Sequence, residues 1–271
     1  MFKLLHDKVL CIAHRGASSL APENTLAAAR KALELGADMW ELDVSVTAEG
    51  ELVVLHDDSL ARTTNVRALY PQRSPWLISI FSLAEVQSLD AGSWFVETDP
   101  FGTITGGALS SAEQAAYRGE PIPTLAEALR FTGERQWRVN VEIKALTPPL
   151  ENFPVAERVV ALIEALGLVE SVLLSSFEHG YLWQAKRLNP AIAVAALIDA
   201  GEAWPADWNR YDAIHPYAGS VDPAQVQAAR RAGVAINPWT ANDPAEMQRL
   251  SAAGVTGIFT DFPQRLLKLR G

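Results

Sequence analysis

The stretch VLCIAHRGASSLAPEN (residues 9–24) begins with a short apolar run, Val9–Ala13, which predicts a buried strand. The run ends abruptly in a histidine, an arginine and a glycine: His14, Arg15 and Gly16. Arginine carries a permanent charge that suits phosphate oxygens, and histidine can move protons near neutral pH. Groups of these two kinds at the end of a strand indicate a functional site, in which Arg15 would bind phosphate.

From this strand onward, short apolar runs alternate with amphipathic stretches that end at glycines such as Gly36 and Gly254. Eight principal strands are expected near residues 10, 40, 140, 173, 195, 213, 235 and 258, each followed by a helix or by room for one. Eight strand–helix units within about 250 residues predict a TIM (β/α)8 barrel. An open doubly wound sheet is the alternative, but no glycine-rich nucleotide-binding turn follows the first strand.

The alternation stops between about residues 57 and 123, where prolines, glycines and scattered aromatic side chains leave no strand–helix unit recognisable. Within this stretch only Ser82–Leu89 predicts a short helix. We expect a single domain over residues 1–271, in which residues 57–123 form a small insertion after the second strand. The insertion would cap the carboxyl ends of the strands, with Trp94 and Phe101 at the entrance.

Acidic side chains occupy alternate positions on the expected second strand. Glu41 and Asp43 project from one face of it and, with Glu142 on the next strand, would form an oxygen-rich pocket. Such a pocket suits one hard divalent cation, Mg²⁺ or Ca²⁺. The alternatives are a solvated strand face and, for Glu142, an ordinary ion pair with Lys144. We favour the metal site, because three acids at one rim would repel each other without a cation.

Further polar and aromatic side chains fall where catalytic groups of barrels gather, at the carboxyl ends of the strands. His14 and His56 are the expected acid–base pair, and Lys144 adds positive charge for the phosphate. The remaining candidates for pocket walls and substrate contacts are Phe177, His215 and Trp239. Aromatic residues at strand ends also pack into cores, which is the alternative for Phe177 and Trp239.

The composition narrows the class of protein. The net charge is −9, which argues against nucleic acid as a partner. No uncharged run approaches the ~18–20 residues of a membrane span, and Lys3, Asp7 and Lys8 interrupt any apolar core of a signal peptide. The single cysteine, Cys11, allows no intrachain disulfide. We therefore expect a cytoplasmic monomer or homodimer that binds neither nucleic acid nor membranes.

With these residues identified, the chain resembles the glycerophosphodiester phosphodiesterase family of the bacterial cytoplasmic type. Each matching segment is weak by itself, but the combination is specific and runs nearly from end to end. The segments are HRGAS…PENT (14–25), ELDVSVTAEGELVVLHDDSLARTT (41–64), LDAGSWF (89–95), PIPTLAEAL (121–129), VEIK (141–144), SSF (175–177) and GVTGIFTDFP (254–263).

The resemblance implies a TIM barrel with an insertion after the second strand. It also implies a divalent-metal enzyme that splits glycerophosphodiesters into sn-glycerol 3-phosphate and an alcohol. Carried over position by position, it assigns acid–base catalysis to His14 and His56, the metal to Glu41, Asp43 and Glu142, and the phosphate to Arg15 and Lys144. The chain departs from many relatives at Asn65–Pro75, a longer stretch that we expect to influence the choice of alcohol.

Two other functions are open to the same barrel. A lipid phosphodiesterase of the phospholipase C or D type is disfavoured, because neither a secretion signal nor an amphipathic membrane-binding helix is recognisable. A phosphate-ligand-binding barrel without catalysis is disfavoured, because a binder needs no pair of proton-transferring histidines. The attacking group is left open between a water activated by the cation and the 2-hydroxyl of the substrate's own glycerol.

Overall fold

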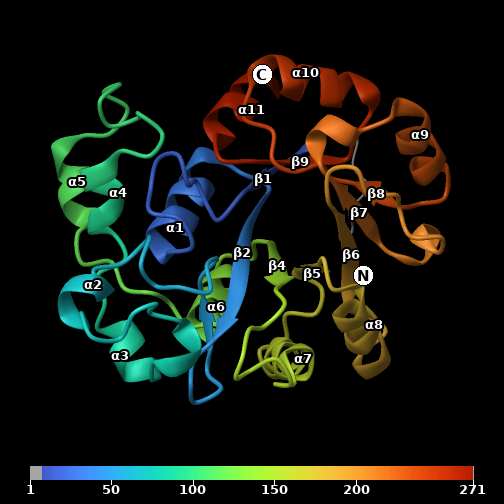
Figure 1. Ribbon diagram of the computed structural model, residues 1–271. Coiled ribbons are helices and arrows are strands. Elements are labelled where there is room, and N and C mark those ends of the chain that lie inside the picture. The colour runs from blue at the N-terminus through green and yellow to red at the C-terminus, as the bar shows by residue number, and fades with distance from the viewer. Residues whose placement is uncertain (1–7, 271) are drawn as a thin grey trace.

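The computed structural model describes residues 8–270, which fold into a nearly closed barrel of eight parallel strands (Figure 1). Around the barrel the strands follow the order β8 (Ala235–Ile236), β7 (Ala213–Pro216), β6 (Ala193–Ile198), β5 (Val172–Ser176), β4 (Val139–Ile143), β2 (Met39–Val46), β1 (Leu10–Ala13) and β9 (Gly257–Thr260). The Thr256 N–H donates to the Ile236 carbonyl at 2.8 Å and brings β9 beside β8. The predicted TIM barrel is confirmed. The expectation about a signal peptide concerns Met1–Leu10, of which residues 1–7 lie outside the described residues.

Helices cover the outside of the barrel, and they begin and end close to the expected positions. They are α1 (Leu26–Leu35), α6 (Leu125–Glu134), α7 (Val155–Ala165), α8 (His179–Leu188), α9 (Pro223–Arg231), α10 (Pro244–Ala253) and α11 (Pro263–Arg270). The predicted capping box between Thr124 and Glu127 starts α6, and Gly36 ends α1 with a φ of 87°. After β6 the described chain forms only the 3-10 turn η2 (Trp208–Arg210) in place of a helix.

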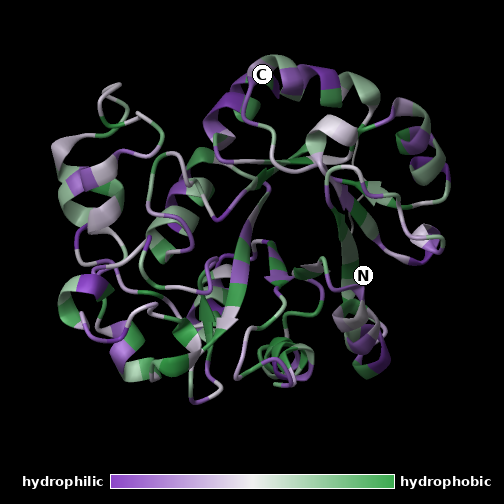
Figure 2. Ribbon diagram, in the orientation of Figure 1, coloured by the Kyte–Doolittle hydropathy of each residue, from purple (hydrophilic) through white to green (hydrophobic). Residues whose placement is uncertain are grey.

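Alternation along the strands divides the apolar residues into two layers. On β2, Trp40, Leu42 and Val44 pack outward against the helices, whereas Glu41 and Asp43 belong to the opposite face, as predicted. Figure 2 shows hydrophobic colour along the strands and mixed colour around the helices. The inner layer is small: Leu10, Ile12, Met39, Leu173, Ala193, Ala195, Ala213, Ala235 and Phe259. Polar side chains at the carboxyl ends of the strands complete the inside of the barrel.

The stretch between β2 and α6 starts with β3 (Leu52–Val54), which pairs antiparallel with β2 and forms the expected hairpin. It continues in four short helices, α2 (Val66–Leu69), α3 (Leu83–Gln87), α4 (Ser93–Thr98) and α5 (Ser111–Tyr117), and the 3-10 turn η1 (Ile78–Ile80). Only α3 was predicted. The other helices have four to seven residues, too few for a helical period to show in the sequence.

The insertion packs at the side of the barrel, where α2–α5 lie together next to α1 (Figure 1). Lys31 on α1 pairs with Glu113 on α5 at 2.5 Å, and the Ala27 N–H donates to Glu120 at 3.0 Å. The insertion also contacts the loops that follow β1 and β9, because the Thr103 hydroxyl donates to the Ser19 carbonyl at 2.6 Å and Phe101 packs against Phe262, and its role as a cap over the rim stays a prediction. A core of the insertion's own, which includes Val66 and Phe81, holds these helices together.

The contacts of the insertion correct the expected placement of its two aromatic residues at the entrance. The Arg62 guanidinium lies 5.8 Å from the Trp94 ring, and Phe101 packs edge-on against Phe262, so neither aromatic residue lines the catalytic cavity described below. The Asn65–Pro75 stretch is tied to the insertion's own core through Val66 and Tyr70. A deletion there would remove part of this core, and the expected influence of the stretch on the choice of alcohol stays a prediction.

Gly16 sits where the backbone turns away from β1, and its substitution tests how closely the turn approaches α1. Its φ is +83°, and a Cβ would lie 2.6 Å from the backbone of Ala28. Gly36 has nearly the same φ, +87°, but open space around it. We expect Gly36→Ala to lower the free energy of unfolding by about 1–2 kcal/mol. Gly16→Ala should cost about 1–3 kcal/mol more because of the overlap, measured by urea denaturation. Equal losses in the two variants would contradict this reading.

Candidate active site

The polar strand ends surround a cavity of about 230 Å³ at the carboxyl rim of the barrel. Its walls are His14, Arg15, Glu41, His56, Asn140, Glu142, Lys144, Ser175, Phe177, Leu197, Trp239 and Phe259. Larger cavities exist elsewhere on the protein, but their walls lack this combination of histidines, cations and carboxylates. The convergence of charged groups on one rim, predicted from the strand order, is therefore present.

Three acidic side chains lie together at the site, and two of them, Glu41 and Glu142, line the cavity. Carboxylate oxygens of Glu41, Asp43 and Glu142 lie within 4.8 Å of one another, because β2 and β4 pair with Asp43 opposite Glu142. One oxygen of Glu41 accepts the backbone N–H of Arg15 at 2.7 Å, and the other is buried without a hydrogen-bond partner. Asn24 donates to Asp43 at 2.8 Å. The cluster thus presents oxygen donors that the protein leaves partly unsatisfied.

The charges of these acids oppose one another. Burial, together with the charge of Asp43, raises the pKa of Glu41 to about 8, and the same two causes raise the pKa of Glu142. Burial also acts on Asp43, but Arg15, His56 and Lys144 outweigh it and hold the pKa of Asp43 below its usual value. An unpartnered buried oxygen and an excess of negative charge fit a hard divalent cation that prefers oxygen ligands. The acidic cluster therefore has the chemistry of a site for such a cation.

His14 is held by an acidic partner from the far end of the chain. Its Nδ1 lies 2.7 Å from Asp261, whose carboxylate also accepts from Ser18 and Asn242, so Nδ1 carries the proton and Nε2 is left for chemistry. Burial lowers the pKa of His14, but the hydrogen bond to Asp261 and the charges of Asp261 and Glu41 outweigh it. The pKa of His14 is therefore higher than its usual 6.5.

His56 is held in the same way by a neighbouring carboxylate. Its Nδ1 lies 2.7 Å from Asp57, and Asp57 accepts from Arg62 at 2.6 Å. Arg62 also donates two hydrogen bonds to Glu23, at 2.7 and 2.8 Å, and Glu23 accepts from Arg15 at 2.9 Å. We call these five residues, His56, Asp57, Arg62, Glu23 and Arg15, the charge network. It joins the start of the insertion to the end of β1.

The other predicted residues divide into two groups. Lys144 lines the cavity with its Nζ 3.7 Å from Glu142, and the rings of Phe177 and Trp239 meet edge to face at 5.4 Å. His215 does not line the cavity, which corrects the expected substrate contact. Its side chain is fully buried inside the barrel against Phe259, and burial lowers its pKa to about 3. An inward position on β7 leaves it beneath the rim.

Sequence reasoning missed three residues that orient the site. Asp261 directly follows β9, so the rule that strand ends carry functional groups would have found it if applied to the last strand. Glu23 lies within residues 9–24, and Arg62 within the segment ARTT (residues 61–64). No local pattern pairs Glu23 with Arg62, because they meet only after the insertion has folded against the barrel.

Asp261→Asn tests the cause of the raised pKa of His14. Without the carboxylate, burial dominates, and the pKa of His14 should fall below 6.5. Because the pKa of His14 is higher in the folded protein than its usual 6.5, protonation of His14 contributes its full stability below pH 6.5. This contribution disappears as the pH rises through the pKa of His14 in the folded protein. The stability lost in Asp261→Asn should therefore be larger at pH 5 than at pH 9. A ring NMR titration of metal-free protein measures the shift, with His179 as internal control; an unshifted His14 would refute the assignment.

The sequence and the structure are both similar to those of known phosphodiesterases. Residues 14–265 match the model of the glycerophosphoryl diester phosphodiesterase family. A glycerophosphodiester phosphodiesterase from Caldanaerobacter subterraneus subsp. tengcongensis is 36% identical over 97% of this chain and 98% of its own. A putative glycerophosphoryl diester phosphodiesterase from Silicibacter pomeroyi has a similar structure, with a TM-score of 0.82, 26% identity and coverage of 97% and 94%. An Oleispira antarctica phosphodiesterase, solved with the product sn-glycerol-3-phosphate, gives a TM-score of 0.74 and 30% identity over 96% and 95%.

Proposed function

Because the chain belongs to the glycerophosphoryl diester phosphodiesterase family, we propose that it hydrolyses glycerophosphodiesters to sn-glycerol 3-phosphate and an alcohol with His14, His56 and one divalent cation. The observation that carries the proposal is the cavity itself. It joins two histidines, each oriented by a carboxylate, to two cationic side chains and a cluster of three acids. A phosphodiester needs each of these groups, for charge neutralisation or for proton transfer.

The metal is assigned to the acidic cluster. Glu41, Asp43 and Glu142 would hold one divalent cation, Mg²⁺ or Ca²⁺, through oxygen atoms only. When bound, the cation supplies positive charge to the phosphate oxygens. Arg15 and Lys144, which line the same cavity, would bind the non-bridging oxygens of the diester and set its orientation.

The two histidines are assigned opposite roles. The raised pKa of His14 favours its protonated form near neutral pH, so His14 would give a proton to the departing alcohol. His56 would take the proton from the 2-hydroxyl of glycerol, whose oxygen attacks phosphorus and expels the alcohol. Water then opens the cyclic phosphate: His14 takes its proton, and protonated His56 returns one to the glycerol O2. The products are sn-glycerol 3-phosphate and the free alcohol.

An internal nucleophile fits the residues at the site. The 2-hydroxyl is tethered beside phosphorus, which removes most of the entropic cost of bringing the two groups together. The histidines then exchange roles between the two steps, which accounts for a pair of them. It also explains why the phosphate stays on glycerol.

The alternative functions lack support of this kind. Among residues 8–270, none of the helices has the length and apolar character required to cross a bilayer. A barrel that only binds phosphate leaves the two histidine–carboxylate pairs without a role. A cytoplasmic location, a monomeric or homodimeric state and a single domain over residues 1–271 stay predictions.

The direct test is release of sn-glycerol 3-phosphate from glycerophosphoethanolamine by the purified protein. We expect release with Mg²⁺ or Ca²⁺, loss of activity with chelator, and recovery when the cation is restored. Release that continues unchanged under exhaustive chelation would refute the metal assignment. Failure to cleave any glycerophosphodiester under all metal conditions would refute the proposed function.

Glu41→Gln should have opposite effects on stability with and without the cation. The pKa of Glu41 is about 8 in the folded protein and ordinarily 4.5, so folding becomes less favourable as the pH rises between these values. At pH 8 without metal, the variant should be about 1–3 kcal/mol more stable than the wild type. Saturating cation should stabilise the wild type more than the variant. Thermal denaturation across pH measures both effects, and a less stable metal-free variant would contradict the prediction.

A further inference from the structure

The carboxylate that orients His14 is anchored by the barrel itself. Asp261 accepts hydrogen bonds from Ser18 at 3.0 Å and from Asn242 at 2.6 Å, in addition to its contact with His14. Ser18 lies in the loop after β1 and Asn242 in the loop after β8. Two barrel loops therefore fix Asp261 independently, and the loss of one partner would leave the other in place.

The carboxylate that orients His56 depends on a single residue. Asp57 lies 2.7 Å from His56 Nδ1, and among residues 8–270 its carboxylate accepts its other hydrogen bonds from Arg62 alone, at 2.6 and 3.0 Å. Arg62 belongs to the start of the insertion, and 42% of its side chain is exposed. A long, half-exposed side chain keeps one orientation only where another group binds it, because fixing its rotamers costs entropy.

Glu23 supplies that anchor from the barrel. Its two oxygens accept hydrogen bonds from both Nη atoms of Arg62, at 2.7 and 2.8 Å, in the bidentate geometry that makes carboxylate–guanidinium pairs strong. Glu23 also accepts from Arg15 Nη1 at 2.9 Å, and only 10% of its side chain is exposed. The planar guanidinium of Arg62 therefore bridges two carboxylates, Asp57 in the insertion and Glu23 on the barrel.

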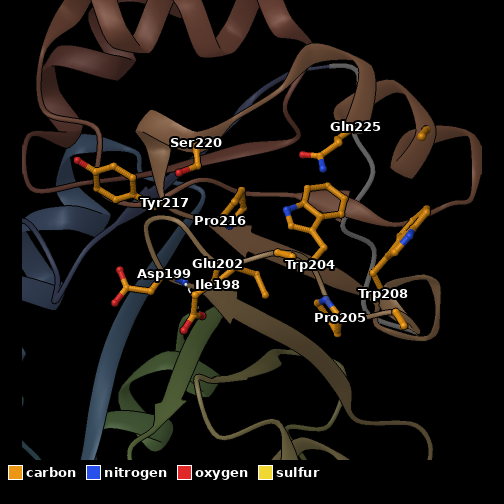
Figure 3. A pocket seen from close by; sticks show the side chains of 13 residues that line it. Ile198, Asp199, Glu202, Trp204, Pro205, Trp208, Pro216, Tyr217, Ser220 and Gln225 are labelled. Atoms are coloured by element: carbon orange, nitrogen blue, oxygen red, sulfur yellow. Dashed lines mark hydrogen bonds between the residues drawn. The ribbon is translucent and has the colours of Figure 1, made fainter.

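The side of the barrel away from the insertion gives the histidines no such support. The loop after β6 leaves a cavity of about 520 Å³ there, whose walls include Asp199 and Tyr217 (Figure 3). None of the wall residues of this cavity forms a hydrogen bond to His14 or His56. The orientation of His56 thus depends on the segment that follows β3 and on its contact with the loop after β1.

We propose that Arg62 and Glu23 are positioning residues for His56, so that the insertion completes the active site of the barrel. The inference rests on the proposed function, because it concerns the proton transfer assigned to His56. Arg62 fixes Asp57, and Asp57 holds the ring with its proton on Nδ1 and with Nε2 free to react. Because Glu23 also binds Arg15, one carboxylate sets both the proton-transferring ring and the phosphate-binding guanidinium.

Arg62→Ala tests the inference. Its kcat for glycerophosphoethanolamine should be about 10–100-fold lower than that of the wild type, with little change in KM, because Arg62 does not line the cavity. Millimolar guanidinium should restore part of the lost kcat by entering the vacated, partly exposed position between Asp57 and Glu23. Because guanidinium weakens folded proteins, it would only lower the activity of a variant that was unstable.

A matched control and a conservative variant accompany this test. Arg118→Ala removes another arginine–carboxylate pair of the insertion, with Glu97 at 3.0 Å, and should change neither kcat nor KM. Arg62→Lys keeps the charge but cannot bridge two carboxylates through a planar fork, so it should lose part of kcat while it folds normally. Wild-type kcat in both Arg62 variants, or a loss of kcat in Arg62→Ala without any recovery in guanidinium, would overturn the inference.

A double substitution tests the order of the contacts. Glu23→Gln weakens the anchor of Arg62 and should lower kcat in the wild-type background. In the Arg62→Ala background the same substitution should lower kcat much less, because Glu23 acts on His56 through Arg62. Equal factors in the two backgrounds would contradict this order.

The ring tautomer of His56 gives a readout that needs no turnover. In the metal-free wild type, ¹⁵N NMR at alkaline pH should show His14 and His56 each with the proton on Nδ1. Arg62→Ala should give a mixture of tautomers at His56 and leave His14 unchanged. A tautomer change in a protein that cleaves no diester would defeat the proposed function alone. Normal cleavage, with kcat and tautomer unchanged in Arg62→Ala, would defeat the inference alone.

Discussion

A glycerophosphodiester with hydrogen in place of the glycerol 2-hydroxyl is expected to react at least about 10⁴-fold more slowly than the normal diester. The proposed route uses this hydroxyl as the nucleophile, so its removal leaves no attacking atom in the first step. Arg15, Lys144 and the acidic cluster would still bind the remaining phosphodiester. The deoxy compound should therefore act as a competitive inhibitor with an inhibition constant close to the KM of the normal substrate.

The measurement follows release of the alcohol from both compounds, with ³¹P NMR to observe the cyclic glycerol phosphate from the normal diester. An independently prepared cyclic phosphate is the control, because the protein should open it to sn-glycerol 3-phosphate. Turnover of the deoxy compound within about tenfold of the normal diester would establish direct attack by water. In that case the metal and phosphate assignments would stand and the assigned nucleophile would be wrong.

His14→Asn and His56→Asn are each expected to lower kcat for glycerophosphoethanolamine by about 10²–10⁴-fold, with smaller changes in KM. The loss reflects proton transfer, because Arg15 and Lys144 still bind the phosphate. The two variants should differ on a diester of 4-nitrophenol, which leaves without needing a proton. His14→Asn should regain most of the lost rate on this substrate, whereas His56→Asn should not.

His179→Asn provides the matched control. His179 Nε2 donates to the Leu197 carbonyl at 3.1 Å, and its ring packs against Tyr211 outside the catalytic cavity. It should retain wild-type kcat on both substrates. Recovery of His56→Asn in place of His14→Asn would reverse the two roles, and near-normal kcat in both variants would refute acid–base catalysis by this pair.

The barrel could be predicted because its signals are local. Each strand is a short apolar run, and glycines such as Gly36 and Gly254 end the helices with left-handed backbone at the predicted positions. The site followed from one further rule, that strand ends of a barrel share a rim. Glu41, Asp43 and Glu142 needed no more than this rule and the two-residue period of a strand to be brought together.

Features that depend on tertiary packing could not be predicted in this way. His215 ends a strand like the site residues, yet the inward pleat of β7 buries it against Phe259. The helices of the insertion are too short for a period, and their position beside α1 depends on contacts such as Lys31 with Glu113. The partnership of Glu23 with Arg62 spans 39 residues and appears only in the folded protein.

The charge network limits which chimeras between this protein and its relatives can keep an intact active site. His56, Asp57 and Arg62 come from the segment after the hairpin, whereas Glu23 and Arg15 come from the first barrel unit. A chimera that takes the insertion from one relative and the barrel from another would receive half of these partners from each parent. If the new barrel lacked an acid at the position of Glu23, Arg62 would lose its two hydrogen bonds to that residue. The orientation of Asp57 and His56 would then be less well fixed, while the fold remained intact. A functional chimera should therefore take both segments from the same parent, although 38 residues of strand, helix and hairpin separate Glu23 from Arg62.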